Sequence, residues 1–421
     1  MLRADQSVNV TQAGAATPLR PLQGIRVLDV SQFAAGPFGT MLLADAGADV
    51  IKIERPGSGD PQREFGPFRD DGHGGRVGGG ILRFGRNKRS LALDLSLPAG
   101  QELFLDLAKQ ADVVWENLAP GTMEQFGLGY ARLREVNPRL IYAAISGFGH
   151  PDILESPYWQ RPAFDLVAQA MSGIMDLTGQ PGGPPTAVGT IVGDLVPALF
   201  CLAGVLMALR MREFTGEGQL VDVAMYDATG VLCERAAMTY AMTGKAPARG
   251  EESIVAPYDV YRAKGGYVVI AATHQRGWGR LCEAIGRMDL LADPRLATAA
   301  DRAEHAEDLL RPALEGWLAD RSKVEAADYL AGRGVPAAAV QTIAEMMCCP
   351  HMAARQMVRT MAHPVAGDVL VIGNPIKLSA VPEPDLRPVP AVGEHSAALL
   401  RELLGYEDTQ IAALRAAGVV G

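Results

Sequence analysis

The sequence predicts the α/β fold class: a Rossmann-like large domain with a parallel sheet, joined to a smaller α+β domain. The chain has 421 residues, which is too long for one ordinary domain. Its composition, 48% hydrophobic and 21% charged, is that of a folded globular protein. From about residue 22, short β-branched runs alternate with helix-length segments, and this pattern changes after residues 243–255.

Five strands separated by helices are expected in the first part of the chain. The strands are expected at 24–30, 49–54, 90–95, 112–117 and 139–149, and the clearest helices at 39–47 and 98–110. Strands joined by helices of this length form parallel sheets with helices on both faces. The longest apolar helix is expected at 195–212, followed by a strand and the start of a helix over 218–230.

Beyond residue 255 the pattern predicts a smaller α+β domain and then a further segment. Two strands are expected around the Gly265–Gly266 turn, within 258–272. Helices are expected at 277–285, 301–319 and 323–333. A hairpin is expected at 363–379, followed by a proline-rich stretch to Pro390 and a terminal helix.

Charge and composition restrict the possible partners. The formal net charge of -9 argues against nucleic acid or an anionic membrane as the main partner. Residues 1–20 lack the apolar core of a secretory signal. The longest apolar run, Leu195 to Leu209, is shorter than the roughly 20 residues that span a bilayer. We therefore expect a cytoplasmic protein with a flexible tail over 1–20.

Neither the cysteines nor the glycines indicate a cofactor site. The five cysteines are odd in number and show no CxxC spacing, so neither a disulfide framework nor a metal site is expected. The segment after the first strand does not fit GxGxxG, and the glycine-rich residues 74–80 follow no convincing strand. Those glycines are interpreted as a flexible loop.

Asp194 is a single acid in front of a long apolar segment, within "GTIVGDLVPAL" (189–199). One interpretation is structural, because Asp is a favoured helix N-cap whose side chain accepts hydrogen bonds from the first turn. The other is chemical, because a carboxylate at a helix start in a partly dry site can act as a nucleophile. The local sequence leaves both open.

Several stretches together resemble one family, the family III coenzyme A transferases, also called the CaiB/BaiF family. They keep the family's order along nearly the whole chain: 21–60, 86–95, 111–130, 137–149, 188–199, 215–228 and 363–379. The resemblance implies an interlocked homodimer and a large domain built from both ends of the chain. The expected divisions are a tail at 1–20, large-domain segments at 21–230 and 336–421, and a linker with the small domain at 231–335.

The resemblance also implies the chemistry and the ligands. Asp194 is expected to attack an acyl-CoA thioester, with N–H groups at the start of helix 195–212 keeping it ionised. Acyl-CoA and a free carboxylic acid are the expected substrates, and no tightly bound cofactor is expected. CoA contacts carried over from the family, together with three basic candidates for the CoA phosphates, are Arg55, Leu93, Asn117, Leu118, Ala34, Ala35, Arg86, Lys88 and Arg89.

Departures from the family pattern narrow the range of expected substrates. Ala34 stands where formyl-CoA transferases have a glutamine, and Gln125 where some members have an arginine. The glycine-rich loop of formyl-CoA transferases is replaced by "EESIVAPYDVY" (251–261). These departures disfavour formyl-CoA and oxalate, and favour a dicarboxylic or larger acyl partner.

Two alternatives to acyl transfer remain open. The related α-methylacyl-CoA racemases use a His and Asp pair, in which the His precedes another Asp in a "GHD" segment. In the matching stretch Phe164 stands at the His position and Asp165 is kept. Phe164 cannot carry a proton, so two-base chemistry lacks one member. A non-catalytic CoA-binding protein would keep Arg55 and Asn117 and would not need Asp194. Covalent labelling by acyl-CoA separates that alternative from a transferase.

Overall fold

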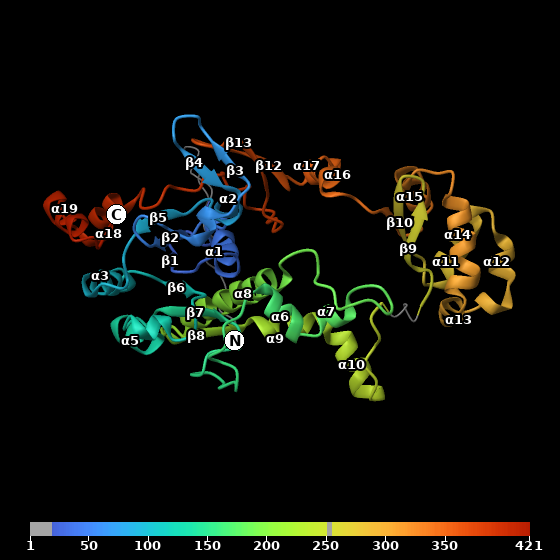
Figure 1. Ribbon diagram of the computed structural model, residues 1–421, viewed down its shortest axis with the longest axis horizontal. Helices are drawn as coiled ribbons and strands as arrows, with labels where there is room; N and C mark the ends of the chain where they lie inside the picture. Colours follow the sequence, from blue (N-terminus) through green and yellow to red (C-terminus); the bar gives the residue numbers. More distant parts are fainter. Residues whose placement is uncertain (1–18, 251–254) are drawn as a thin grey trace, which may run out of the picture. The chain divides into compact units, whose positions relative to one another are not determined.

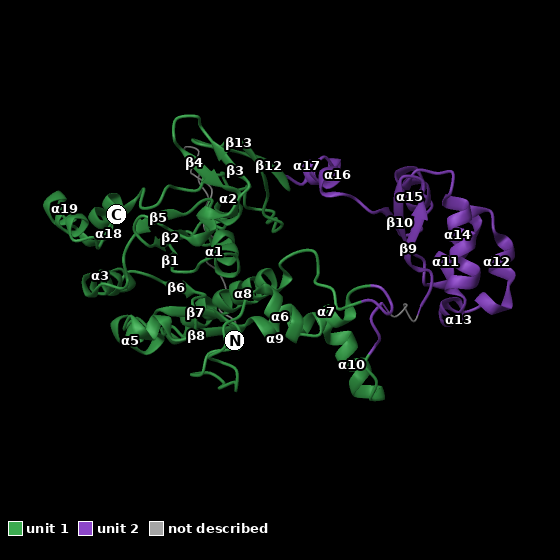
Figure 2. Cartoon of the chain, in the orientation of Figure 1, with its two compact units in different colours: residues 1–179, 184–246, 357–421 green, residues 180–183, 247–356 purple. Residues whose placement is uncertain are grey.

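The computed structural model describes residues 19–250 and 255–421 and divides the chain into two compact units (Figures 1 and 2). Unit 1 contains the chain up to 179, 184–246 and 357–421, and unit 2 contains 180–183 and 247–356. These boundaries differ from the predicted 231 and 335, because the helix after residue 233 remains with unit 1 and the helices within 343–354 remain with unit 2. Most of the predicted tail, and residues 251–254 of the substituted loop, lie outside the described residues.

A six-stranded parallel sheet forms the centre of unit 1, which confirms the predicted sheet (Figure 1). Its order is β5-β2-β1-β6-β7-β8. Numbered along the chain, this is the doubly wound order 3-2-1-4-5-6, in which ligands bind where the order reverses. The strands are β1 (Arg26–Asp29), β2 (Asp49–Glu54), β5 (Arg89–Ala92), β6 (Val113–Glu116), β7 (Ile141–Ser146) and β8 (Leu220–Ala224).

Helices cover both faces of this sheet because alternate strand residues point to opposite sides. Val27, Val50 and Val113 face a core that includes α1 (Ala35–Asp45) and α8 (Val192–Thr215). Leu28, Ile51 and Val114 face the other core. That second core receives α3 (Pro98–Ala108), α5 (Tyr130–Val136), α18 (Ser396–Leu404) and α19 (Asp408–Ala416). The C-terminal segment therefore returns to the sheet that the N-terminal half begins.

The glycine-rich residues 74–80 are not the loop that the sequence predicts. Strand β4 (Arg76–Gly78) pairs with β3 (Phe68–Asp70), and α2 (Gly79–Phe84) begins immediately afterwards. A Cβ at Gly78 would lie 2.4 Å from the Phe65 carbonyl oxygen. The glycine therefore permits close backbone contact rather than flexibility.

The remaining elements of unit 1 are short, apart from α10. They are the 3₁₀ helices η1 (Pro61–Glu64) and η2 (Val231–Cys233), the helices α4 (Thr122–Gln125), α6 (Asp165–Met171), α7 (Ile174–Leu177), α9 (Met225–Gly230) and α10 (Glu234–Thr243), and the hairpin β12 (Val358–His363) with β13 (Gly367–Ile372). Helix α6 packs against α8 and α9, so its first residue lies near the start of α8.

Unit 2 has its own core around an antiparallel sheet of order β11-β10-β9. Its strands are β9 (Tyr258–Ala263), β10 (Gly266–Ala271) and β11 (Ala337–Ala339). Its helices are α11 (Gln275–Ile285), α12 (Met288–Ala292), η3 (Pro294–Leu296), α13 (Ala299–Glu304), the π-helical η4 (Ala306–Leu310), α14 (Arg311–Leu318), α15 (Lys323–Ala331), α16 (Ile343–Met347) and α17 (Pro350–Ala354). The single helix predicted at 301–319 is thus interrupted by a π turn.

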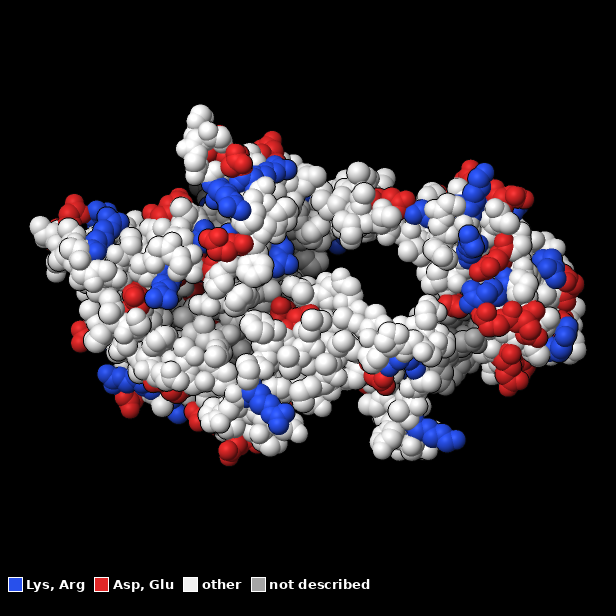
Figure 3. Space-filling view, in the orientation of Figure 1, with Lys and Arg blue, Asp and Glu red and all other residues white. Residues whose placement is uncertain are grey.

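Helix α8 is longer than predicted and has two different faces. It contains 24 residues and is apolar enough, by length and composition, to cross a membrane. One face packs on α1, α9, β7 and β8, as expected of a core helix. Its other face exposes apolar side chains: Leu199, Phe200, Leu206, Met207, Met211 and Phe214. Figure 3 shows a largely uncharged surface over α6, α8 and α9.

Candidate active site

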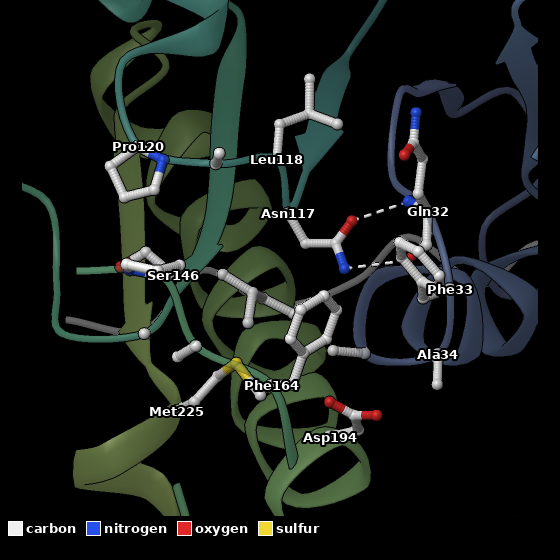
Figure 4. Close-up of a pocket in the computed structure, with 16 residues that line it drawn as sticks. Gln32, Phe33, Ala34, Asn117, Leu118, Pro120, Ser146, Phe164, Asp194 and Met225 are labelled. Carbon is white, nitrogen blue, oxygen red and sulfur yellow. Dashed lines mark hydrogen bonds between the residues drawn. The ribbon is translucent and has the colours of Figure 1, made fainter. Parts of the chain in front are cut away.

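The loops after β1 and β6 meet where the strand order of the sheet reverses. The Asn117 side chain ties them together: its Oδ1 accepts from Gln32 N at 2.7 Å and its Nδ2 donates to Gln32 O at 2.9 Å (Figure 4). Gly36 follows in α1, where a Cβ would lie 2.1 Å from Ser31 Cβ. Both ends of the first loop are therefore fixed by local contacts.

The buried ion pair of Lys52 and Asp60 also contacts the loop after β1. Asp60 accepts a hydrogen bond from Phe33 N at 3.2 Å, and its other oxygen lies 2.8 Å from Lys52 Nζ. Lys52 also donates to Ser31 O at 2.8 Å. These contacts hold Phe33 at φ 61, a left-handed conformation that is uncommon for a bulky residue.

Asp194 is the third residue of α8, so the interpretation as an N-cap is wrong. The helix begins at Val192, and Asp165 Oδ1 accepts from Gly193 N at 2.8 Å in the capping role. The other early N–H groups are also occupied: Val192 N by Thr190 O, and Asp194 N and Leu195 N by Ile191 O. None of them is free to stabilise the Asp194 carboxylate.

The electrostatics of Asp194 follow from that arrangement. Burial, together with the negative charge of Asp165, raises the pKa of Asp194 to about 6, and Arg83 acts in the opposite direction. The expectation that helix N–H groups keep this carboxylate ionised is therefore wrong. A carboxylate short of donors is poorly solvated, which favours its reactivity as a nucleophile.

The carboxylate of Asp194 faces a cavity of about 270 Å³ in unit 1 (Figure 4). The rings of Phe33 and Phe164 pack edge to face at 5.7 Å on one side. Ala34 and Ala35 also line the cavity, at the start of α1. No side chain caps α1, and among the described residues no acceptor occupies the N–H of either alanine. These N–H groups can serve as donors to a ligand.

Phe164 and Asp165 have separate environments at the start of α6. Phe164 lines the cavity and is 62% exposed. Asp165 accepts from Gln169 Nε2 at 2.8 Å as well as from Gly193 N. None of the described residues lining the cavity is a histidine. His150 lines a neighbouring cavity instead, with its Nε2 3.8 Å from Glu124.

The residues predicted to contact CoA divide into two groups. Arg55 is exposed directly after β2, and Asn117 and Leu118 line the Asp194 cavity with Ala34 and Ala35. Leu93 has 2% of its surface exposed and lies in the core, so it offers a ligand almost no side-chain surface.

The basic cluster does not fit its predicted role at the CoA phosphates. Lys88 is buried, and its Nζ donates to Asp29 at 2.9 Å and to Thr40 at 2.8 Å. Arg89 donates to both oxygens of Asp49 and also pairs with Glu402. Their donors already bind carboxylates of this chain, which argues against Lys88 and Arg89 as phosphate ligands. The neighbouring Arg86 is likewise paired with Asp45.

Sequence reasoning missed Asp60 and Lys52, although the strand "DVIKIE" contained a signal. A central strand of a parallel sheet is buried on both faces, so Lys52 and Glu54 had to be paired inside the fold. Within 19–250 and 255–421, no group of three His, Cys, Asp or Glu side chains is arranged to hold a metal ion.

The fold and the site define an α/β protein with a ligand site at the reversal of its sheet and a carboxylate short of hydrogen-bond donors. The model of CoA-transferase family III matches residues 22–396. The chain belongs to this family and is an enzyme, which confirms the resemblance found in the sequence.

Three known proteins illustrate the relationship. The succinyl-CoA:mesaconate CoA-transferase of Haloarcula hispanica is 46% identical, covering 90% of this chain and 96% of the relative. The acetyl-CoA:oxalate CoA-transferase of Acetobacter aceti is 39% identical, covering 94% of this chain and all of the relative. The crystal structure of a CaiB/BaiF family protein from Brucella suis has a TM-score of 0.79 at 35% identity, covering 91% of this chain and 99% of that one.

Proposed function

We propose that this chain transfers CoA from an acyl-CoA thioester to a dicarboxylic acid, with Asp194 as the nucleophile. The observation that carries the proposal is the state of Asp194 in the cavity. It is half-buried and has no hydrogen-bond donor within the described residues, and its pKa is raised to about 6 by burial and by Asp165. At neutral pH the carboxylate is ionised and weakly solvated.

The proposed reaction forms and breaks bonds in four steps. A carboxylate oxygen of Asp194 attacks the thioester carbonyl; the C–O bond forms, the C–S bond breaks and CoA thiolate leaves. The thiolate then attacks the Asp194 carbonyl of the mixed anhydride, which releases the donor acid and leaves an aspartyl-CoA thioester. The acceptor carboxylate attacks this thioester; the C–S bond breaks, CoA thiolate leaves again and a second anhydride forms. Finally, CoA thiolate attacks the acceptor's acyl carbon and regenerates Asp194.

Ala34 and Ala35 are the proposed donors to the oxyanions that form in these steps. Their N–H groups lie at the start of the 11-residue helix α1 and line the same cavity as Asp194. Donors fixed in advance of the reaction stabilise developing negative charge without reorganisation. Asn117 and Asp60 contact the loop after β1 and hold Gln32 and Phe33 in one conformation, which supports the proposal.

Phe164 favours acyl transfer over racemisation. A two-base racemase needs a second proton carrier at the α-carbon, and among the described residues lining the cavity Asp194 is the one acid or base. A non-catalytic role is disfavoured because a binding protein gains nothing from a carboxylate kept short of donors.

The substrate class rests on the names of the relatives. Succinate, mesaconate and oxalate each carry two carboxyl groups, and the two relatives described above are named for them. The relative named for oxalate keeps this acid among the candidates, despite the departures at Ala34 and Gln125. The decisive assay supplies succinyl-CoA and measures new acyl-CoA with mesaconate, glutarate, oxalate and a monocarboxylate. If none of these acids becomes a thioester, the proposed activity is wrong.

We also propose a homodimer, for which the outer face of α8 provides support. Exposed apolar residues at positions 199, 200, 206, 207, 211 and 214 lie at helical spacing. An apolar surface of this kind is typical of a face covered by a partner, here a second copy of the chain. Sedimentation should give a dimer, and Met207→Glu should weaken it. A monomer at all concentrations would contradict the assembly.

A further inference from the structure

A dicarboxylic substrate brings a second negative charge into a site that already contains Asp194. Among the described residues that line the Asp194 cavity, none is a lysine, arginine or histidine. A carboxylate taken out of water is costly unless a cation or hydrogen bonds compensate for the lost solvation. A cation close to this cavity would therefore favour a substrate with a second carboxylate.

Arg83 of α2 occupies a suitable position. Its side chain lines an adjoining apolar cavity of about 920 Å³, together with Leu195 and Phe65. Leu195 directly follows Asp194 in α8, and the Phe65 ring packs against Phe33 at 6.3 Å. The two cavities are thus neighbours along Phe33 and the first turn of α8.

Arg83 lines the adjoining cavity without a carboxylate partner among the described residues. Its guanidinium donates to Gln62 Oε1 at 3.3 Å and lies 4.8 Å from the centre of the Phe84 ring, and Arg83 is in no ion pair among the described residues. Three neighbouring cations are each paired with a buried carboxylate. These pairs are Arg63 with Glu54, Arg86 with Asp45 and Lys88 with Asp29.

We infer that Arg83 binds the distal carboxylate of a dicarboxylic substrate, so that the chain prefers dicarboxylic over monocarboxylic acids. This inference rests on the proposed transferase function and extends it to a specificity-determining residue. A guanidinium presents parallel N–H donors that match the two oxygens of a carboxylate. The ring of Phe84 and the amide of Gln62 hold the side chain and leave donors free for the ligand.

The pKa of Asp194 is consistent with this position of Arg83. Arg83 is the cation that lowers the pKa of Asp194, against the larger effects of burial and Asp165. Its charge therefore reaches the reacting group, although Arg83 and Asp194 line different cavities.

The test compares two acceptors of similar size, succinate and propionate, with acetyl-CoA as donor. In Arg83→Met, kcat/KM for succinate should fall roughly 30-fold, mainly through KM, because one charged contact is lost. The value for propionate should change less than about 3-fold on the same basis. Arg83→Lys should keep part of the preference. The matched control is Arg76→Met, which removes an exposed arginine that packs over Phe68 and lines neither cavity.

Each other outcome has a definite meaning. An equal loss with both acids would overturn the inference and assign Arg83 to the conformation or pKa of Asp194. No loss with succinate would also overturn it. If the wild-type enzyme uses no monocarboxylate, the expected result is a rise of the succinate KM with kcat nearly unchanged. A wild-type enzyme that transfers CoA to neither acid here, and to none of the acceptors from succinyl-CoA, would instead contradict the proposed function.

Discussion

Two carboxylates near the carboxyl edge of the same sheet, Asp29 and Asp194, have opposite environments. Asp29 ends β1, is fully buried and accepts hydrogen bonds from Ser31, Thr40 and Lys88. Burial opposes its ionisation, but the positive charges of Lys88 and Lys52 prevail and lower the pKa of Asp29 to about 2. Asp194 has no such donors, and burial raises its pKa to about 6.

The difference separates a structural carboxylate from a reactive one. Depth alone does not distinguish them, since Asp29 is the more deeply buried of the two. The two carboxylates are distinguished by the hydrogen-bond donors that contact them. Asp29 holds together loops that carry the site, whereas Asp194 remains available for bonding to a substrate.

The largest expected effect is the loss of activity in Asp194→Asn. Removal of the nucleophile should reduce kcat by roughly 1,000-fold or more. The melting temperature should stay the same or rise, because the variant removes a charge that burial disfavours. Initial rates and thermal unfolding measured on one preparation check both parts. A folded variant that keeps more than a few per cent of the activity would show that Asp194 is not the nucleophile.

Asp29→Asn should mainly reduce the stability of the fold. It leaves Lys88 buried without its charge partner, which should cost about 3–5 kcal/mol of unfolding free energy. Denaturant unfolding measures this loss. The double variant with Lys88→Met should recover part of it, because no unpaired ammonium remains. If Asp29→Asn and Asp194→Asn destabilise equally, the contrast between the two carboxylates does not hold.

The contrast was only partly visible in the sequence. The alternation of strands and helices predicted the parallel sheet, because βαβ units leave a pattern over short stretches. Lys88 was expected at a phosphate, whereas its partner is Asp29, 59 residues away. Pairing across such distances leaves no local signal. Asp194 was identified through its family, but its donor-poor environment depends on how α6 packs against α8.

The pH profile should reveal the raised pKa of Asp194. Attack requires the ionised form, so kcat/KM should be flat above about pH 6 and fall about 10-fold per pH unit below it. Asp165→Asn keeps an oxygen for Gly193 N and removes the charge that raises the pKa of Asp194, so the inflection should move to lower pH. An inflection that is unchanged in this variant would indicate titration of the substrate or of another group.

Hydrogen exchange at the substrate's α-carbon should be the smallest effect. Acyl transfer removes no α-proton, so a 2-methylacyl-CoA in heavy water should acquire no deuterium from the native enzyme. Phe164→His supplies the residue that racemases have, but a base misplaced by about 1 Å can lose some 100-fold in rate, so only a trace is expected. Mass spectrometry of the recovered thioester measures the exchange. Rapid deuteration by the native enzyme would assign a different reaction.

The most direct test of the proposed mechanism is chemical trapping at Asp194. The enzyme is incubated with succinyl-CoA and hydroxylamine, digested and mapped by mass spectrometry, with Asp194→Asn and a reaction without succinyl-CoA as controls. An anhydride or thioester of Asp194 is far more electrophilic than a free carboxylate, so we expect a hydroxamate on Asp194 that appears only with succinyl-CoA. Full turnover with Asp194 unmodified, or with another residue modified in its place, would contradict it.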